Sequence, residues 1–173
     1  QEHQSVSRYK ELAERSFVVY SFGKTFHVTG WKTGYVLAPS NLMAEFRKVH
    51  QFNVFTANAP IQYALAEYMI NSDNYMSVAA EYQRKRDVFL SAVEGSRFKV
   101  KPSKGTYFQL LDYSTISDEA DTELAKRLTI EHKIASIPVS VFYHNPVQNN
   151  VLRFCFAKEE ETLLRAGEII SSI

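Results

Sequence analysis

The segment S-F-G-K-T-F-H-V-T-G-W-K-T-G, residues 21–34, contains the side chains best suited to covalent chemistry. Lys24 follows a short apolar run that we expect to form a buried strand, and a lysine held near such a strand end loses hydration, which favours its neutral form. A neutral amine attacks an aldehyde and forms a Schiff base. Ser21 and Lys32 add a hydroxyl and a second cation, which suit a phosphate group. These are the parts needed to hold pyridoxal phosphate.

The position of Lys24 also fits two other interpretations. A lone lysine near a strand end is usually a solvated surface residue, because lysine is rarely buried. Gly23-Lys24-Thr25 matches the end of the nucleotide phosphate loop G-x-x-x-x-G-K-[ST], but the first glycine of that loop would fall at Val18, among strand-forming residues. No nest of backbone amides can form there, so the nucleotide-loop interpretation is rejected.

Arg153 is the second candidate. On a strand over residues 151–156, alternate side chains share a face, so Arg153 lies on the face of Val151 and Cys155. A guanidinium in such apolar company needs an anionic partner. That partner is either an Asp or Glu in a structural ion pair or the carboxylate of a substrate, held by a bidentate contact.

The elements that must position these residues follow from the hydrophobic pattern. Residues 17–22 and 35–38 are short, apolar and rich in β-branched or aromatic side chains, which predicts strands. Ser40 is expected to cap one helix, Pro60 to lie in the first turn of the next, and residues 75–93 to form a long third helix. After residue 95 the pattern is typical of a compact α/β or α+β unit, with strands at 98–101, 106–111, 134–137 and 151–156 and helices at about 119–131 and 158–172.

The pattern in the first part of the chain predicts too few strands for a complete domain. Two strands are too few for an independent sheet, and a run as apolar as 17–22 is typical of a strand that has neighbouring strands on both sides. We therefore expect residues 1–79 to be the tail of a larger domain and residues 80–173 to form a smaller one. The first residue is not methionine, which agrees with a piece of a longer protein.

Composition excludes several classes of protein. The 173 residues include 20 Lys and Arg against 19 Asp and Glu, a net charge of +1, whereas nucleic-acid binders concentrate positive charge. No apolar run approaches the about 20 residues of a membrane helix, and the five histidines lack metal-ligand spacing. Cys155 is the single cysteine, so no internal disulfide can form, and we expect a reducing compartment, the cytoplasm.

Residues 21–34 resemble the pyridoxal-phosphate lysine signature of class I/II aminotransferases, and Gly30-Trp31-Lys32 resembles their kynurenine and methionine aminotransferase branch. The similarity runs from Ser16 to about Glu161. Its further motifs are H-Q-F-N-V-F-T-A-N-A-P at 50–60, G-T-Y-F at 105–108, I-P-V-S-V-F-Y at 137–143 and R-F-C-F-A-K at 153–158.

The resemblance implies the α/β architecture of a fold-type I pyridoxal-phosphate transferase. Residues 1–79 would be the C-terminal remnant of its large cofactor domain with a linking helix, and residues 80–173 its small C-terminal domain. By position, Lys24 would bond covalently to the cofactor aldehyde, and Ser21 and Lys32 would bind the cofactor phosphate.

The resemblance also assigns substrate and partner contacts. Arg153 would hold the α-carboxylate of the amino-acid substrate. Phe55 and Thr56 match positions that reach into the active site of the neighbouring subunit, which implies a homodimer.

The implied activity is transfer of an amino group from an amino acid with a large hydrophobic, aromatic or sulfur-containing side chain to a 2-oxo acid. The Asp-x-x-Tyr motif of the family, whose acid faces the pyridine nitrogen of the cofactor, does not occur in this chain, so we expect a C-terminal fragment that is inactive alone. Two alternatives share the same residues: a carbon–sulfur β-lyase, and a non-catalytic domain retained for ligand sensing or dimerisation.

Overall fold

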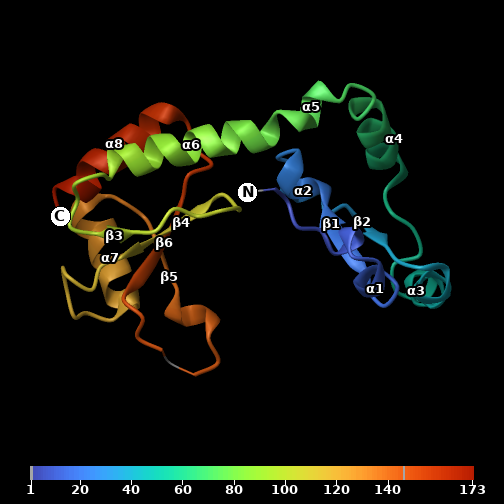
Figure 1. The fold of residues 1–173 in the computed structure, drawn as a ribbon, viewed down its shortest axis with the longest axis horizontal. Coiled ribbons are helices and arrows are strands. Elements are labelled where there is room, and N and C mark those ends of the chain that lie inside the picture. The colour runs from blue at the N-terminus through green and yellow to red at the C-terminus, as the bar shows by residue number, and fades with distance from the viewer. Residues whose placement is uncertain (1, 146) are drawn as a thin grey trace. The chain divides into compact units, whose positions relative to one another are not determined.

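The computed structural model describes residues 2–145 and 147–173, and its chain divides into two compact units, residues 1–78 and 79–173 (Figure 1). In the first unit, helices and short 3₁₀ turns (η) surround a two-stranded sheet. Its elements are η1 (Val6–Arg8), α1 (Lys10–Ala13), β1 (Val18–Ser21), α2 (Phe22–Thr25), η2 (Thr29–Trp31), β2 (Gly34–Leu37), α3 (Ser40–Asn53), α4 (Ala59–Tyr68) and α5 (Asp73–Met76).

Strands β1 and β2 pair antiparallel, with Val18 opposite Leu37 and Ser21 opposite Gly34. Within the described residues β1 is exposed rather than buried: Val19 is 73% exposed, because β1 pairs with β2 alone and no second layer covers that face. The burial expected for this strand depends on neighbouring strands that the chain does not contain. Of the hydrophobic residues described in this unit, Leu65 alone is buried. The first unit therefore has almost no core of its own.

The helices of the first unit differ from the sequence prediction in two details. Pro39, not Ser40, occupies the N-cap of α3, and Ser40 is already helical. Pro60 lies in the first turn of α4 as predicted, behind an Asn58 side chain that accepts a hydrogen bond from Ile61 N at 3.2 Å. The long third helix is interrupted at Ser77, whose hydroxyl donates to Asp73 O at 3.3 Å and so competes with the helical hydrogen bonds.

The second unit contains a four-stranded antiparallel sheet in the order β3-β4-β6-β5. Its elements are α6 (Val78–Ala92), β3 (Lys99–Val100), β4 (Phe108–Asp112), α7 (Asp121–His132), β5 (Ile137–Pro138), η3 (Ser140–Phe142), β6 (Val151–Cys155) and α8 (Glu160–Ser171). The strand predicted at 134–137 is almost entirely absent. Lys133 ends α7 in a left-handed conformation and Ile134 N bonds back to Leu128 O, so these residues terminate a helix instead.

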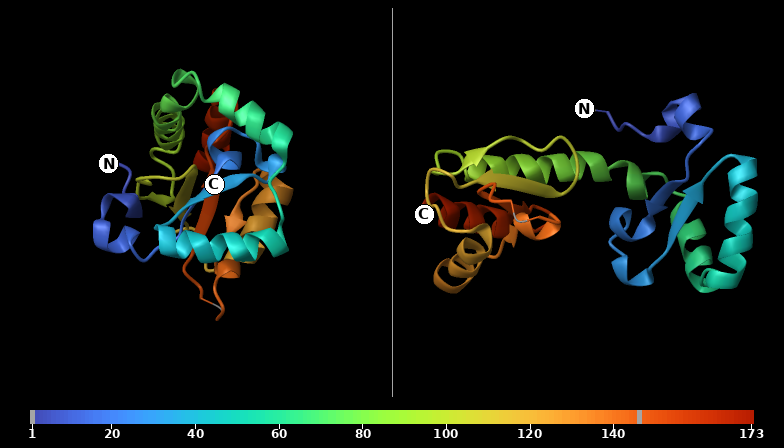
Figure 2. Two further views of the ribbon diagram at one scale, coloured as in Figure 1. Left: turned by 90° about the vertical axis from the view of Figure 1, so that its right-hand side faces the viewer. Right: turned by 90° about the horizontal axis from the view of Figure 1, so that it is seen from below.

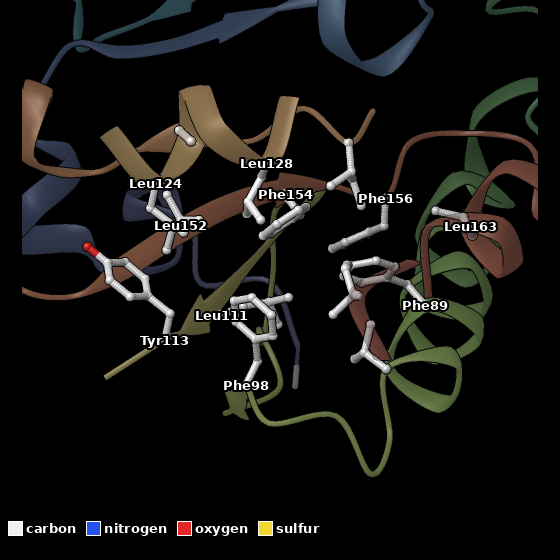
Figure 3. Packing of buried hydrophobic residues seen from close by; sticks show 14 residues of the cluster. Phe89, Phe98, Leu111, Tyr113, Leu124, Leu128, Leu152, Phe154, Phe156 and Leu163 are labelled. Carbon is white, nitrogen blue, oxygen red and sulfur yellow. The ribbon is translucent and has the colours of Figure 1, made fainter. Parts of the chain in front are cut away.

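One face of this sheet carries the core of the second unit (Figure 3). Alternation along β6 buries Leu152 and Phe154, which belong to one cluster with residues of α6, α7 and α8. Helices α6 and α8 run side by side (Figure 2) and approach so closely that a Cβ on Gly167 would lie 2.3 Å from Ala92 Cβ. Because these helices take up one face, the side chains of β6 that point the other way, Arg153 among them, lie on the open face.

Candidate functional site

The β1–β2 hairpin brings together the three residues expected to hold a cofactor. Ser21 ends β1 opposite Gly34, and Phe22 N donates to Thr33 O at 3.2 Å, which closes the loop at that point. The loop contains Lys24 in α2 and Lys32 directly after η2. A hydroxyl and two ammonium groups therefore lie at one end of a single hairpin.

Tight backbone packing fixes the shape of this loop. Gly23 is buried, and a Cβ there would lie 3.0 Å from Thr29 Cα. Val28 N donates to Gly23 O at 3.0 Å, and His27 and Lys32 adopt left-handed φ values of 56° and 53°. Gly23 lets α2 and η2 approach closely, so Lys24 lies on a compact helical turn.

The exposure of Lys24 corrects the expectation of a desolvated amine. Ser21, Lys24 and Lys32 are all exposed, and none of the three side chains has a hydrogen-bond or ion-pair partner within residues 2–145 and 147–173. The physical reason is that the described part of the chain packs against the Phe22 side of α2 and leaves the Lys24 side chain uncovered. The donors still fit a phosphorylated aldehyde: the hydroxyl and one ammonium suit the phosphate, and the other amine suits the aldehyde.

Arg153 occupies the centre of the open face of the second unit. It is opposite Leu110 on β4 and Ile137 on β5. The guanidinium carbon lies 4.0 Å from the ring centroid of Phe108 and 5.0 Å from that of Phe142. The positive charge is thus held between two aromatic faces, an arrangement that is favourable when the cation is partly desolvated.

Arg153 lacks the structural ion pair that the sequence left open. No carboxylate of the described chain pairs with it, and its Nε is buried without a hydrogen-bond partner. A buried, unsatisfied donor on a cation is costly. This environment therefore favours binding of an external anion.

Phe55 and Thr56 follow α3 in the first unit. Phe55 has a φ of 70° and is 78% exposed, with its N–H bonded to His50 O at 2.9 Å. The Thr56 hydroxyl donates to Ala57 O at 3.1 Å. A large exposed ring held on a strained backbone is a feature expected of a contact residue.

Sequence reasoning missed Phe108 and Phe142 as neighbours of Arg153. The register that sets Phe108 opposite Cys155 is a tertiary property, and Phe142 comes from a 3₁₀ turn rather than from a strand. The available signal was the pair of aromatic residues in each of the motifs at 105–108 and 137–143.

Within the described residues there is no cluster of three or more potential metal ligands, and no helix is long and apolar enough to cross a membrane.

The chain is similar to aminotransferases over nearly its whole length. The family model "Aminotransferase class I and II" matches residues 2–170. Methionine aminotransferase of Escherichia coli K12 is 46% identical over 169 residues, and kynurenine–oxoglutarate transaminase of Dictyostelium discoideum is 31% identical over 190 residues. Each match covers 97% of this chain and 44% of the relative, so the chain spans less than half the length of these proteins.

A solved structure agrees with these matches. The crystal structure of an E. coli protein identified as a methionine aminotransferase superposes with a TM-score of 0.94 at 45% identity, covering 99% of this chain and 46% of that one.

Proposed function

Because the chain belongs to the aminotransferase class I and II family, we propose that the protein containing it transfers an amino group from an amino acid to a 2-oxo acid with pyridoxal phosphate as cofactor. The observation that carries the proposal is the hairpin that gathers Ser21, Lys24 and Lys32 with no partner for any of them in the described chain. An unpaired amine beside an unpaired hydroxyl and a second cation is the donor set this chemistry needs.

Lys24 is the proposed catalytic residue. When bound, pyridoxal phosphate supplies an aldehyde and a ring that accepts electrons from the substrate. Ser21 and Lys32 would bind its phosphate. The Lys24 amine would remove the proton from the substrate α-carbon as a base and, as the resulting ammonium, would return that same proton to the reacting substrate–cofactor unit as an acid.

Arg153 is the proposed carboxylate-binding residue. Its guanidinium binds the carboxylate that amino-acid and 2-oxo-acid substrates share, a charge-assisted contact worth about 1.5–3 kcal/mol. The rings of Phe108 and Phe142 restrict the orientation of the guanidinium. Fixing the carboxylate orients the α-carbon for proton transfer.

The names of the relatives support a substrate class. They are a methionine aminotransferase and a kynurenine–oxoglutarate transaminase, which favours amino-group transfer over the lyase and non-catalytic alternatives. The same names favour an amino donor with a large hydrophobic, aromatic or sulfur-containing side chain.

We also propose a homodimer in which Phe55 and Thr56 line the site of the partner subunit. Support comes from the exposed ring of Phe55 and from a first unit that buries almost no apolar side chain.

The function is tested by Arg153→Gln in the full-length protein. Loss of the charge-assisted contact is expected to raise KM for both L-methionine and its 2-oxo acid about 10- to 100-fold, while the absorbance of the bound cofactor stays unchanged. Arg97→Gln is the matched control, because Arg97 is exposed and donates to backbone carbonyls of Thr115 and Ile173. An unchanged KM for both substrates in the Arg153 variant contradicts the assignment.

A further inference from the structure

Asp121 is a buried carboxylate that the proposed chemistry does not use. It is 4% exposed and is the first residue of α7. Its Oδ2 accepts a hydrogen bond from Ser140 N at 2.7 Å and its Oδ1 accepts one from Ser140 Oγ at 2.5 Å. Both carboxylate oxygens therefore bind one residue, and that residue lies 19 positions away in the sequence.

Ser140 begins the 3₁₀ turn that carries Phe142. Phe142 N donates to Val139 O at 3.2 Å and Tyr143 N donates to Ser140 O at 3.1 Å, so the turn is held by its own backbone. The side chain of Phe142 is 62% exposed and does not belong to the buried core. The position of its ring is therefore set by the backbone of η3 rather than by packing.

Two attachments fix that backbone. On the N-terminal side, β5 pairs with β6, with Pro138 opposite Leu152. At Ser140 itself, the attachment is the pair of hydrogen bonds to Asp121. Phe108 differs, because it lies within β4 and the sheet holds it directly.

We propose that Asp121 and Ser140 are positioning residues that hold the Phe142 ring against Arg153 and thereby orient its guanidinium for the substrate carboxylate. The inference rests on the proposed function of Arg153. The two hydrogen bonds of Asp121 fix η3, and of the two rings that the described chain places over Arg153, Phe142 is the one that is not part of a strand. Two short hydrogen bonds from one residue, at 2.7 and 2.5 Å, also restrict the turn to one conformation.

The experiment uses the full-length, cofactor-loaded protein and a graded set of substitutions. Asp121→Ala removes both hydrogen bonds and is expected to raise KM for L-methionine and for its 2-oxo acid about 5- to 20-fold, with kcat within about threefold of wild type. Ser140→Ala removes one bond and is expected to give a smaller increase. Asp121→Asn keeps one oxygen to accept from Ser140 N and offers an NH2 group that can donate to Ser140 Oγ, and Ser140→Thr keeps both donors. Both variants are expected to restore KM toward the wild-type value, which also covers the case in which Asp121→Ala does not fold.

Glu119→Gln is the matched control. It neutralises a neighbouring carboxylate that binds Ser117 and Arg127 instead of η3, so both KM values are expected to stay at the wild-type level. A double-mutant comparison tests the route of the effect: if Asp121 acts through Phe142, Asp121→Ala adds nothing further to KM in a Phe142→Ala background.

The outcomes separate this inference from the function on which it rests. KM raised by Arg153→Gln but unchanged by Asp121→Ala and Ser140→Ala overturns the positioning role alone. The same holds if Asp121→Ala raises KM equally with and without Phe142. An unchanged KM in Arg153→Gln overturns the proposed carboxylate site and this inference with it.

Discussion

Arg153 and Lys24 have contrasting surroundings. Arg153 lies between two aromatic rings, with its Nε buried and unpaired. Lys24 is exposed on a compact turn. The two rings therefore restrict the orientation of the Arg153 guanidinium, whereas the Lys24 amine is free to move in solvent within the described chain.

The pKa of Tyr113 can be measured directly. Tyr113 is a fully buried core residue, and its hydroxyl donates to Glu119 O at 2.9 Å. Burial, with smaller contributions from the charges of Asp121 and Glu119, raises the pKa of Tyr113 to about 12, against 10.0 for a free side chain. As pH rises, the Tyr113 hydroxyl ionises in the unfolded chain before it does so in the folded chain. The contribution of this pKa difference to the free energy of unfolding, about 3 kcal/mol, is therefore complete below pH 10 and is lost as pH rises towards 12.

The measurement is an alkaline titration of tyrosine absorbance in the wild type and in Tyr113→Phe. We expect the difference between the two curves to be centred near pH 12. A difference centred near pH 10 would mean that the hydroxyl is not shielded from solvent.

The types of the candidate site residues could be predicted from the sequence, but their environments could not. The alternation along β6 correctly placed Arg153 on the face of Val151 and Cys155. The absence of an ion pair could not be predicted, because it depends on every acidic residue of the described chain. The burial predicted for Lys24 was wrong, because a local apolar run does not reveal which layers cover it.

At the scale of elements, the β1–β2 hairpin depends on the close approach of its strands at Gly34. A Cβ there would lie 2.3 Å from Tyr20 O, a distance that no real side chain adopts. Gly34→Ala is therefore expected to separate the strands and reduce the cofactor bound per subunit of the full-length protein at least tenfold. Gly30→Ala is the control, because its Cβ would meet nothing within 4 Å and cofactor binding should stay near wild type. Full cofactor content in both variants would show that the hairpin does not position the donors.

Most elements were predicted to within a few residues, and the exceptions share a cause. The third helix breaks where the Ser77 hydroxyl bonds back to Asp73 O. The strand expected at 134–137 is lost because Lys133 and Ile134 end α7. In both places, a local hydrogen bond to a backbone carbonyl, from the Ser77 hydroxyl or from Ile134 N, outweighs the hydrophobic periodicity on which the prediction relied.

For the whole molecule, the predicted family and fold class are confirmed by the match over residues 2–170 and by the TM-score of 0.94. The assignment of residues 1–79 and 80–173 to a large and a small domain stays a prediction, as do the cytoplasmic location and the expected inactivity of residues 1–173 alone. The contrast between the units is physical: the second has a continuous buried cluster, whereas the first exposes Phe52 by 88% and Ile70 by 84%. Apolar surface on that scale indicates contact with further protein.

Subunit complementation tests the proposed dimer. Lys24→Ala and Phe55→Ala should each reduce turnover in the full-length protein. If Phe55 serves the site of the partner subunit, unfolding and refolding the two variants together regenerates complete sites in mixed dimers, about a quarter of all sites for random pairing. The mixture should then be clearly more active than either variant. Activity equal to the mean of the two separate variants would place Phe55 and Lys24 in the same subunit's site or in no common site.

The central claim is that the Nζ of Lys24 bonds to the cofactor aldehyde. The direct measurement is borohydride reduction of the full-length protein loaded with pyridoxal phosphate, followed by proteolysis and mass spectrometry of the peptides. The account predicts a phosphopyridoxyl group on Lys24, and its absence from that peptide in unreduced protein. A stable adduct on another lysine, with Lys24 unmodified, would contradict it.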